Sequence, residues 1–275
     1  MSKRTFLNAL LASALALGLN TGALAQDALA RVKQAGVLKV GTETAFAPFD
    51  FIDAGKHVGL NVDLFDEVAK ELGVKLEWVL LPWDGVLPGL EARKFDMVAG
   101  PATITKARME RYRFSPPIAE ATVALLKRHG DHSVMKPEDI AGKVVGAGKA
   151  SAQADQLRAF IAGLPGKTEL REYPGNNEAY ADLAAGRIVA VANSLPNITY
   201  VAQQRPDTFE VVKPPFGLKS YFGYLGRKDA DSAKLMDAVQ AAILKIKADG
   251  RLAKMQKKWF GDSFDTPDSV TAPAV

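Results

Sequence analysis

DLFDEVAKELGVKLEWVLL, residues 63–81, is the stretch that decides the fold class of this chain. Four of its apolar residues recur at the i, i+3, i+4, i+7 spacing of a helix that buries one face: Phe65, Val68, Ala69 and Leu72. Asp63 is suited to cap the N-terminus of this helix, and Gly73 is suited to end it. The apolar run Leu76 to Leu81 then predicts a strand, so the stretch is typical of the second half of a β-α-β unit.

The flanking residues extend this alternation in both directions. On the N-terminal side a strand is predicted at 37–41, and on the C-terminal side a helix at 86–93 and a strand at 95–99. A second run of the same kind is predicted at 143–146 (strand), 152–162 (helix), 169–173 (strand), 179–185 (helix) and 188–192 (strand). Strands that alternate with helices indicate an α/β fold with parallel sheets covered by helices.

Two further predicted strands, 122–127 and 221–226, flank the second run. If both lie where the chain passes between two lobes, the first lobe is discontinuous and comprises residues 26–120 and 219–262. The second lobe then comprises residues 121–218. A last helix from Ser232 to Lys247, continuing to Trp259 and Phe260, would return to the first lobe. Residues 263–275 are rich in Asp, Ser, Thr and Pro, which predicts a disordered tail.

The N-terminus has the three parts of a secretory signal peptide. Lys3 and Arg4 are positively charged, an apolar run follows from Phe6 to Leu19, and Ala23-Leu24-Ala25 supplies the small-x-small pattern for cleavage after Ala25. The apolar run is shorter than the roughly 20 residues that a membrane-spanning helix needs. We therefore expect residues 1–25 to be removed on export.

Composition narrows the location and the classes of partner. The chain contains no cysteine, which excludes a disulfide framework, a thiolate metal site and a lipid anchor on cysteine. An exported protein without an anchor fits the periplasm of a Gram-negative cell. Removing the signal peptide lowers the formal net charge from +4 to +2. No basic stripe interleaved with aromatic residues is present, so we expect no nucleic-acid partner.

Catalytic and cofactor motifs are scarce. Residues 146–151, GAGKAS, resemble part of a nucleotide-binding loop, but the third glycine is missing and Ser151 does not follow the lysine directly. The three histidines, His57, His129 and His132, lie in predicted loops, and only the last two are close enough in sequence to share a metal. We therefore expect no cofactor and no metal.

Several segments, in order, resemble the polar amino-acid-binding proteins, which are family 3 solute-binding proteins. The central one is GLNVDL at 59–64, followed by Val68-Ala69 and Leu72. The others are GVLKVGT at 36–42, WDGVLPGL at 83–90, Thr103-Ile104-Thr105 with Arg108, and KWFG at 258–261. Asn61 departs from the acidic residue usual there. The resemblance is closest to glutamine- and basic-amino-acid-binding proteins, and implies a type II periplasmic-binding-protein fold, with two lobes joined by two crossing strands and ligand held between them.

The resemblance also implies a set of ligand-binding residues that begins with three in the first lobe. Arg108 would bind a ligand carboxylate, and an arginine fork suits this because it makes two parallel charge-assisted hydrogen bonds. Thr103 would add a hydroxyl and an N–H group. Pro101 falls where the family offers a backbone carbonyl to the ligand ammonium, and proline keeps that carbonyl.

Further positions match from both lobes. Phe46 and Trp83 match the aromatic residues that enclose the ligand side chain, although both would also suit ordinary core packing. Ser151, with the N–H group of Ala152, matches the second-lobe residues that close on the carboxylate, and it would equally serve as a helix cap. Glu43 matches an acidic residue that reads a cationic side chain, and it could instead be a solvated loop residue.

Position 194 departs from the family. An aspartate that pairs with the ligand α-ammonium usually follows the strand matched by residues 188–192, and we align this position with Ser194, preceded by Asn193. Burying an ammonium without a counter-charge costs several kcal/mol. Either Glu43 or another carboxylate compensates, or the ligand is not a standard α-amino acid and is, for example, a keto acid or another organic acid.

The leading functional hypothesis is the periplasmic binding component of an ABC importer, acting as a monomer. It would carry out no chemistry and would deliver a small carboxylate, an amino acid or a relative, to an inner-membrane ABC permease. The alternatives are an enzyme on the same scaffold, similar to the cyclohexadienyl dehydratases, and a ligand sensor for a membrane receptor.

Overall fold

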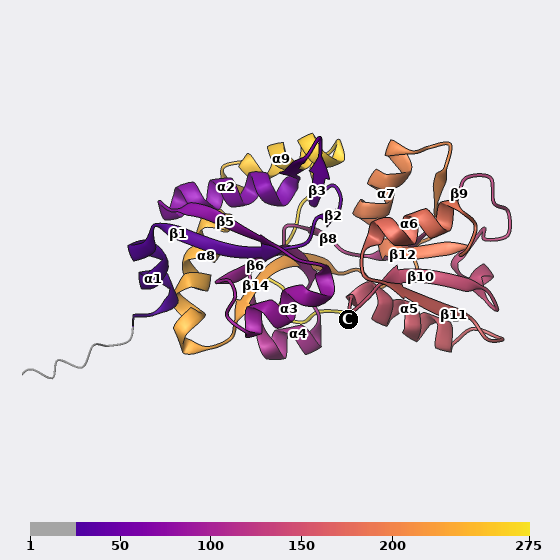
Figure 1. Cartoon of the computed structure of the whole chain (residues 1–275), viewed down its shortest axis with the longest axis horizontal. Coiled ribbons are helices and arrows are strands. Elements are labelled where there is room, and N and C mark those ends of the chain that lie inside the picture. The colour runs from indigo at the N-terminus through magenta and orange to yellow at the C-terminus, as the bar shows by residue number, and fades with distance from the viewer. Residues whose placement is uncertain (1–25) are drawn as a thin grey trace, which may run out of the picture.

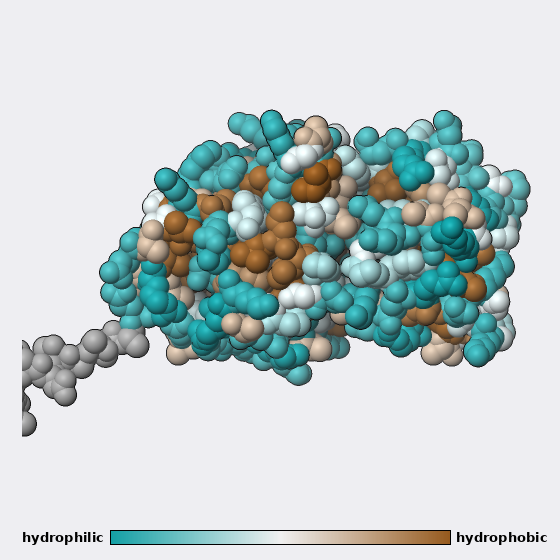
Figure 2. All heavy atoms as spheres, viewed as in Figure 1, coloured by the Kyte–Doolittle hydropathy of each residue, from teal (hydrophilic) through white to brown (hydrophobic). Residues whose placement is uncertain are grey.

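The computed structural model describes residues 26–275, and the signal peptide expected at 1–25 lies outside this part of the chain. Figure 1 shows two lobes side by side, each a sheet covered by helices. No helix within residues 26–275 has both the length and the apolar character needed to cross a membrane. Charged and polar side chains cover most of the face seen in Figure 2, and an apolar patch lies over the middle of lobe 1.

The sheet of lobe 1 has the strand order β5-β1-β6-β14-β7, and β8 also pairs with β14. Its strands are β1 (Val37–Thr42), β5 (Lys75–Leu80), β6 (Met97–Thr103), β7 (Tyr112–Phe114), β8 (Ala119–Glu120) and β14 (Tyr221–Arg227). The first strand, β1, is parallel to β5 and β6, whereas β14 runs antiparallel to its neighbours. The parallel core predicted from residues 37–99 is therefore confirmed.

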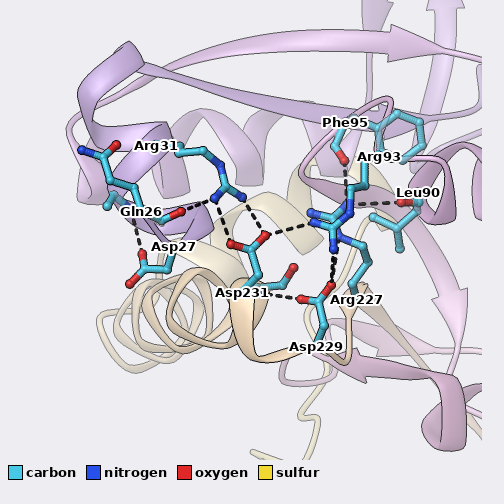
Figure 3. A network of polar contacts seen from close by, with 11 residues as sticks. Gln26, Asp27, Arg31, Leu90, Arg93, Phe95, Arg227, Asp229 and Asp231 are labelled. Carbon is cyan, nitrogen blue, oxygen red and sulfur yellow. Dashed lines mark hydrogen bonds and ion pairs between the residues drawn. The ribbon is translucent and has the colours of Figure 1, made fainter. Parts of the chain in front are cut away.

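Six helices cover the two faces of this sheet. They are α1 (Ala28–Ala35), α2 (Leu60–Leu72), α3 (Trp83–Glu91), α4 (Lys106–Arg111), α8 (Ala230–Ala248) and α9 (Arg251–Phe260). The largest core cluster joins α2 and α8 to β1 and β14, and a second cluster packs α3 against β6 on the other face. A polar network centred on Asp231 joins α1 to the start of α8: Arg31 and Arg93 both bind this carboxylate, at 2.6 and 3.0 Å (Figure 3).

The helix α2 begins at Leu60, three residues before the predicted start at Asp63. Its first amides donate to the backbone, Leu60 to the carbonyl of Pro48 and Asn61 to that of Phe49, so no side-chain cap is needed. Gly59 makes this approach possible, because it has φ 139° and a Cβ there would lie 2.0 Å from the carbonyl oxygen of Phe49. The Asp63 carboxylate instead accepts a hydrogen bond from Trp259 Nε1, at 2.7 Å.

A small antiparallel sheet lies on lobe 1 where it faces lobe 2. It consists of β2 (Ala45–Phe46), β3 (Asp50–Asp53) and β4 (Lys56–Val58). The ring of Phe51 in β3 lies 6.0 Å from that of Tyr200 in lobe 2. This sheet is therefore a point of contact between the lobes.

The sheet of lobe 2 has the order β11-β10-β12-β9-β13. Its strands are β9 (Val123–Arg128), β10 (Val144–Gly148), β11 (Glu169–Tyr173), β12 (Ala190–Ser194) and β13 (Phe209–Val212). The strand β10 is parallel to β11 and β12, as predicted for the second run. Its helices are α5 (Ala152–Ala162), α6 (Asn176–Ala184) and α7 (Leu195–Gln204), with a 3-10 turn, η1 (Pro137–Ile140). Helix α7 was not predicted.

Two chain segments connect the lobes and run side by side. The amide of Ala121 donates to the carbonyl of Ser220 at 2.8 Å, and the amide of Gly217 donates to that of Val123 at 2.9 Å. The strand β8 pairs with the start of β14, through Glu120 opposite Tyr221. Both crossings thus lie immediately before β9 and β14, and we propose lobe boundaries at 120/121 and 218/219.

The tail after residue 262 has no helix or strand but packs on the rest of the protein, which differs from the predicted disorder. Thr266 is buried and donates from Oγ1 to the carbonyl of Pro117 at 2.9 Å. Farther along, the amide of Lys106 donates to the carbonyl of Val275 at 2.8 Å. Composition predicted disorder because it reports little apolar content, whereas this segment is held by individual side-chain and backbone hydrogen bonds that composition does not reveal.

Candidate ligand-binding site between the lobes

A cavity lies between the lobes, and seven of the nine predicted ligand-binding residues line it: Glu43, Phe46, Trp83, Pro101, Thr103, Arg108 and Ser151. Ala152 and Ser194 do not. The lining also includes residues that were not predicted: Gly148, Lys149, Gln153, Pro174, Gly175, Asn176, Asn193 and Phe222. The two lobes contribute to it about equally.

Arg108 is the principal positive charge of the cavity. Its backbone amide donates to the cap residue Thr105, at 3.2 Å, so the side chain leaves α4 within the first turn. One guanidinium nitrogen donates to the carbonyl of Thr103 at 3.1 Å. Burial lowers the pKa of Arg108 to about 10, so it remains cationic at neutral pH. Within residues 26–275 it forms no ion pair, so its charge is not balanced by a carboxylate of the described chain.

Two aromatic side chains from lobe 1, those of Trp83 and Phe46, line the cavity. Trp83 is the first residue of α3, and its Nε1 donates across the gap to the carbonyl of Ala150 at 3.3 Å. Phe46 stacks on Phe49 with ring centroids 5.3 Å apart and meets Phe222 edge-on at 5.7 Å. Phe46 therefore has both predicted roles, because one part of the ring belongs to the core and another faces the cavity.

Pro101 and Thr103 belong to the end of β6, which is longer than the predicted strand at 95–99. The strand continues because β14 pairs with it, Phe222 opposite Thr103, and the sequence does not show this pairing. The carboxyl end of β6 thus lies beside the ends of its neighbours, where ligands bind in open α/β sheets.

Ser151 caps α5 and lines the cavity at the same time. Its Oγ accepts from the amide of Ala154 at 3.1 Å and donates to the carbonyl of Gly148 at 2.6 Å. Because the hydroxyl proton is donated to Gly148, Ser151 could only accept a hydrogen bond from a ligand and could not donate one. Ala152 instead lines a neighbouring apolar groove.

Glu43 is buried rather than solvated, which settles one of the alternatives left open by the sequence. Burial and the nearby charge of Asp50 raise the pKa of Glu43 to about 8. Asp50 is itself fully buried and accepts hydrogen bonds from Asn61 and from the ring of His57, the latter at 2.9 Å. Glu43 is the one carboxylate among the lining residues of this cavity within residues 26–275, and near neutral pH it is largely protonated.

Asn193, and not Ser194, has its side chain at the cavity. Ser194 is fully buried on the other side of β12, and its Oγ has no hydrogen-bond partner within residues 26–275. The prediction that Ser194 lines the site is therefore wrong for this structure, and the neighbouring Asn193 lines it instead. Only one of these two adjacent residues can face the cavity, because successive side chains of a strand point to opposite faces.

Four of the lining residues that were missed share one structural signal. Gly148, Tyr173 and Ser194 end the strands β10, β11 and β12, and Lys149, Pro174 and Asn193 lie at or beside those ends. The carboxyl ends of parallel strands are where open α/β sheets bind ligands. Applying this rule to the predicted strands 169–173 and 188–192 would have pointed to Pro174 and Asn193, which follow them directly.

Comparison with known proteins agrees with this architecture. Residues 38–262 match the bacterial extracellular solute-binding proteins, family 3. The L-cystine-binding protein TcyJ of Escherichia coli (strain K12) is 31% identical over 94% of this chain and 96% of its own length. The lysine/arginine/ornithine-binding periplasmic protein of the same strain is 30% identical, over 91% of this chain and 96% of its own.

Among solved structures, the ancestral amino acid-binding protein AncCDT-1, a precursor of cyclohexadienyl dehydratase, superposes with a TM-score of 0.77. It is 29% identical and covers 84% of this chain and 99% of its own. The family match spans both sheets and every residue that lines the cavity. The chain belongs to the bacterial extracellular solute-binding proteins, family 3.

Proposed function

We propose that the protein is the periplasmic binding component of an ABC importer and holds an amino acid, or a related small carboxylate, between its lobes. The observation that carries this proposal is the buried guanidinium of Arg108, which lines the cavity and has no ion pair within the described chain. A cation in this position is stabilised by a ligand carboxylate that makes two parallel hydrogen bonds with it.

An ammonium group also finds acceptors in the cavity, although none is a permanent counter-charge. The backbone carbonyl of Pro101 lies among the lining residues, and Glu43 becomes an acceptor with a negative charge once it loses its proton. Hydrogen bonds to a charged group contribute about 1.5–3 kcal/mol each. The relatives named for L-cystine and for lysine, arginine and ornithine support an amino acid.

The proposal is tested by a thermal-shift screen of the mature protein against single compounds. The panel comprises L-arginine, L-lysine, L-histidine, L-cystine and L-glutamine, with 2-oxoglutarate and succinate as carboxylates that lack an ammonium group. A compound that binds only the folded state raises the melting temperature. We expect the largest rise with one of the amino acids. If none of the panel raises it at millimolar concentration, the proposal is wrong.

An enzymatic alternative rests on Glu43. A buried carboxylic acid that keeps its proton near neutral pH is suited to donate that proton to a leaving group. AncCDT-1, described as a precursor of cyclohexadienyl dehydratase, makes dehydration the reaction to examine. Incubation with prephenate or arogenate, with product followed by absorbance, would reveal turnover that Glu43→Gln abolishes. A pure binding protein releases both compounds unchanged.

A further inference from the structure

Four polar side chains of lobe 2 form a continuous hydrogen-bonded chain beside the cavity. They are Asn176 at the start of α6, Tyr180 one turn later, Asn193 near the end of β12, and Asn197 in α7, and all four are buried. The Nδ2 atom of Asn193 donates to Asn176 Oδ1 at 3.0 Å and to the Tyr180 hydroxyl at 2.9 Å. The Tyr180 hydroxyl in turn donates to Asn197 Oδ1.

Both ends of this chain reach lobe 1. Asn176 Nδ2 donates to the carbonyl of Ala45 at 3.1 Å, and Asn197 Nδ2 donates to the carbonyl of Ala47. These two carbonyls flank Phe46, which lines the cavity. The chain therefore connects a cavity residue, Asn193, to the segment of lobe 1 that closes over the same cavity.

The direction of every hydrogen bond in the chain follows from its ends. A backbone carbonyl only accepts, so Asn176 and Asn197 must turn their N–H groups toward Ala45 and Ala47 and their oxygens inward. The inward oxygen of Asn176 requires a donor from Asn193, and that of Asn197 requires the proton of the Tyr180 hydroxyl. The hydroxyl then accepts the second N–H group of Asn193, whose own oxygen accepts from the amide of Ser194 at 2.8 Å.

We infer that these four residues form a latch between the two lobes, in addition to the contact of Trp83 with Ala150, and that Asn193 fixes the direction of its hydrogen bonds. Asn193 is then a positioning residue, which joins the ligand cavity to the contact between the lobes. The inference rests on the proposed function in one respect only: it assumes that closure of the lobes encloses a ligand. Burial raises the pKa of Tyr180 far above its ordinary value, so the hydroxyl keeps the proton on which the chain depends.

An aspartate at position 193 reverses the chain. Its carboxylate only accepts, so the amide of Asn176 and the hydroxyl of Tyr180 must both turn to donate to it. Asn176 then presents its oxygen to the carbonyl of Ala45, so this hydrogen bond to lobe 1 is lost. The oxygen of Asn197 loses the proton of Tyr180 and meets another oxygen whichever way the amide turns, so the hydrogen bond to Ala47 is weakened or lost. The amide at position 193 is thus the group that lets lobe 2 donate to lobe 1.

The distance between the lobes provides a test that needs no activity. The protein has no cysteine, so Lys56→Cys in β4 and Gln204→Cys at the end of α7 give two unique, exposed sites for nitroxide labels. The strand β4 pairs with β3, whose Phe51 contacts Tyr200 of α7, so the two labels lie on either side of this contact between the lobes. Pulsed EPR measures the distance between the labels without ligand, and with the amino acid that gives the largest thermal shift.

The latch is broken in this labelled protein by Tyr180→Phe or by Asn193→Asp. Tyr173→Phe is the matched control, because Tyr173 belongs to the same core cluster of lobe 2 but its hydroxyl donates to Asp182 within that lobe, at 2.8 Å. We expect both latch variants to lower the ratio of short to long distances at least about fivefold, the lower end of what an unpaired buried group costs. The control should retain the distribution of the labelled parent.

Two results would overturn the inference. One is a labelled parent with no short-distance population under either condition. The other is an unchanged distribution in both Tyr180→Phe and Asn193→Asp. The proposed function fails separately: a protein that closes through the latch but is stabilised by no compound of the panel retains the inference and loses the function. A protein that binds an amino acid but shows an unchanged distance distribution in both variants retains the function and loses the inference.

Discussion

The guanidinium carbon of Arg108 lies 5.5 Å from the ring centroid of Trp83. The two residues come from α4 and α3, and both line the cavity between the lobes. The indole face stabilises the cation and holds the guanidinium in one orientation. Because one nitrogen donates to Thr103, the remaining N–H groups are free for a ligand carboxylate.

Replacing Arg108 by alanine should therefore weaken ligand binding far more than replacing Arg93 by alanine. Truncating one partner of a buried, hydrogen-bonded charge pair costs about 2–5 kcal/mol. Arg93 is an exposed arginine that pairs with Asp229 and Asp231 (Figure 3), so its loss affects surface ion pairs alone. Calorimetry with the amino acid that gives the largest thermal shift measures the affinity of each variant. Equal affinities for the two variants would remove Arg108 from the site.

Closure of the lobes should make the protein more compact when ligand binds. The crossings at residues 118–122 and 217–221 are two short paired segments, and such a connection bends more easily than the packed lobes on either side of it. Small-angle scattering should show a smaller radius of gyration with saturating ligand. An unchanged scattering profile, with binding verified in the same sample, would contradict a hinge motion.

The two serines of the site prediction should respond in opposite ways to alanine. Ser151→Ala removes a helix cap and should lower the free energy of unfolding by about 1 kcal/mol, since its Oγ accepts from Ala154. Ser194→Ala removes a buried hydroxyl that has no partner within the described residues, so stability should be unchanged or higher. Urea unfolding measures both. A larger loss for Ser194→Ala than for Ser151→Ala would contradict the assigned environments.

The local patterns of the sequence predicted the helices and strands well where hydrophobic spacing determines them. Helix α5 was predicted at 152–162 and strand β11 at 169–173, and both are confirmed with these bounds. The start of α2 was wrong, because its first amides are satisfied by the carbonyls of Pro48 and Phe49 through a turn that no periodicity reveals. Long-range backbone contacts, which propensity does not register, account for this difference.

The candidate site shows the same division between local pattern and three-dimensional context. Seven residues taken from the family resemblance line one cavity. Ser194 was predicted from the resemblance alone, which does not show which face of β12 points to the cavity. The interlobe role of Asn176 and Asn197 was out of reach, because both hydrogen-bond to carbonyls more than a hundred residues away in sequence.

Glu43 should make the stability of the protein depend on pH, which can be measured without any ligand. Its pKa is raised from 4.5 to about 8 by burial, so the unfolded chain loses the proton at a lower pH than the folded protein. Stability is therefore greatest below pH 4.5 as far as this group is concerned, and it falls as pH rises toward 8, by at most about 1.4 kcal/mol per pH unit. Asp50, whose pKa is also raised by burial, lowers the stability with rising pH in the same direction, and it does so in both the parent and the variant.

Glu43→Gln keeps the size of the side chain and removes the titration of Glu43, so urea unfolding between pH 5 and 8 should give a flatter profile of stability against pH for the variant. Glu138→Gln, at an exposed position in η1, is the control and should follow the parent. Parallel profiles for parent and Glu43→Gln would mean that Glu43 is solvated in the folded protein, and would remove it as a protonated group in the cavity.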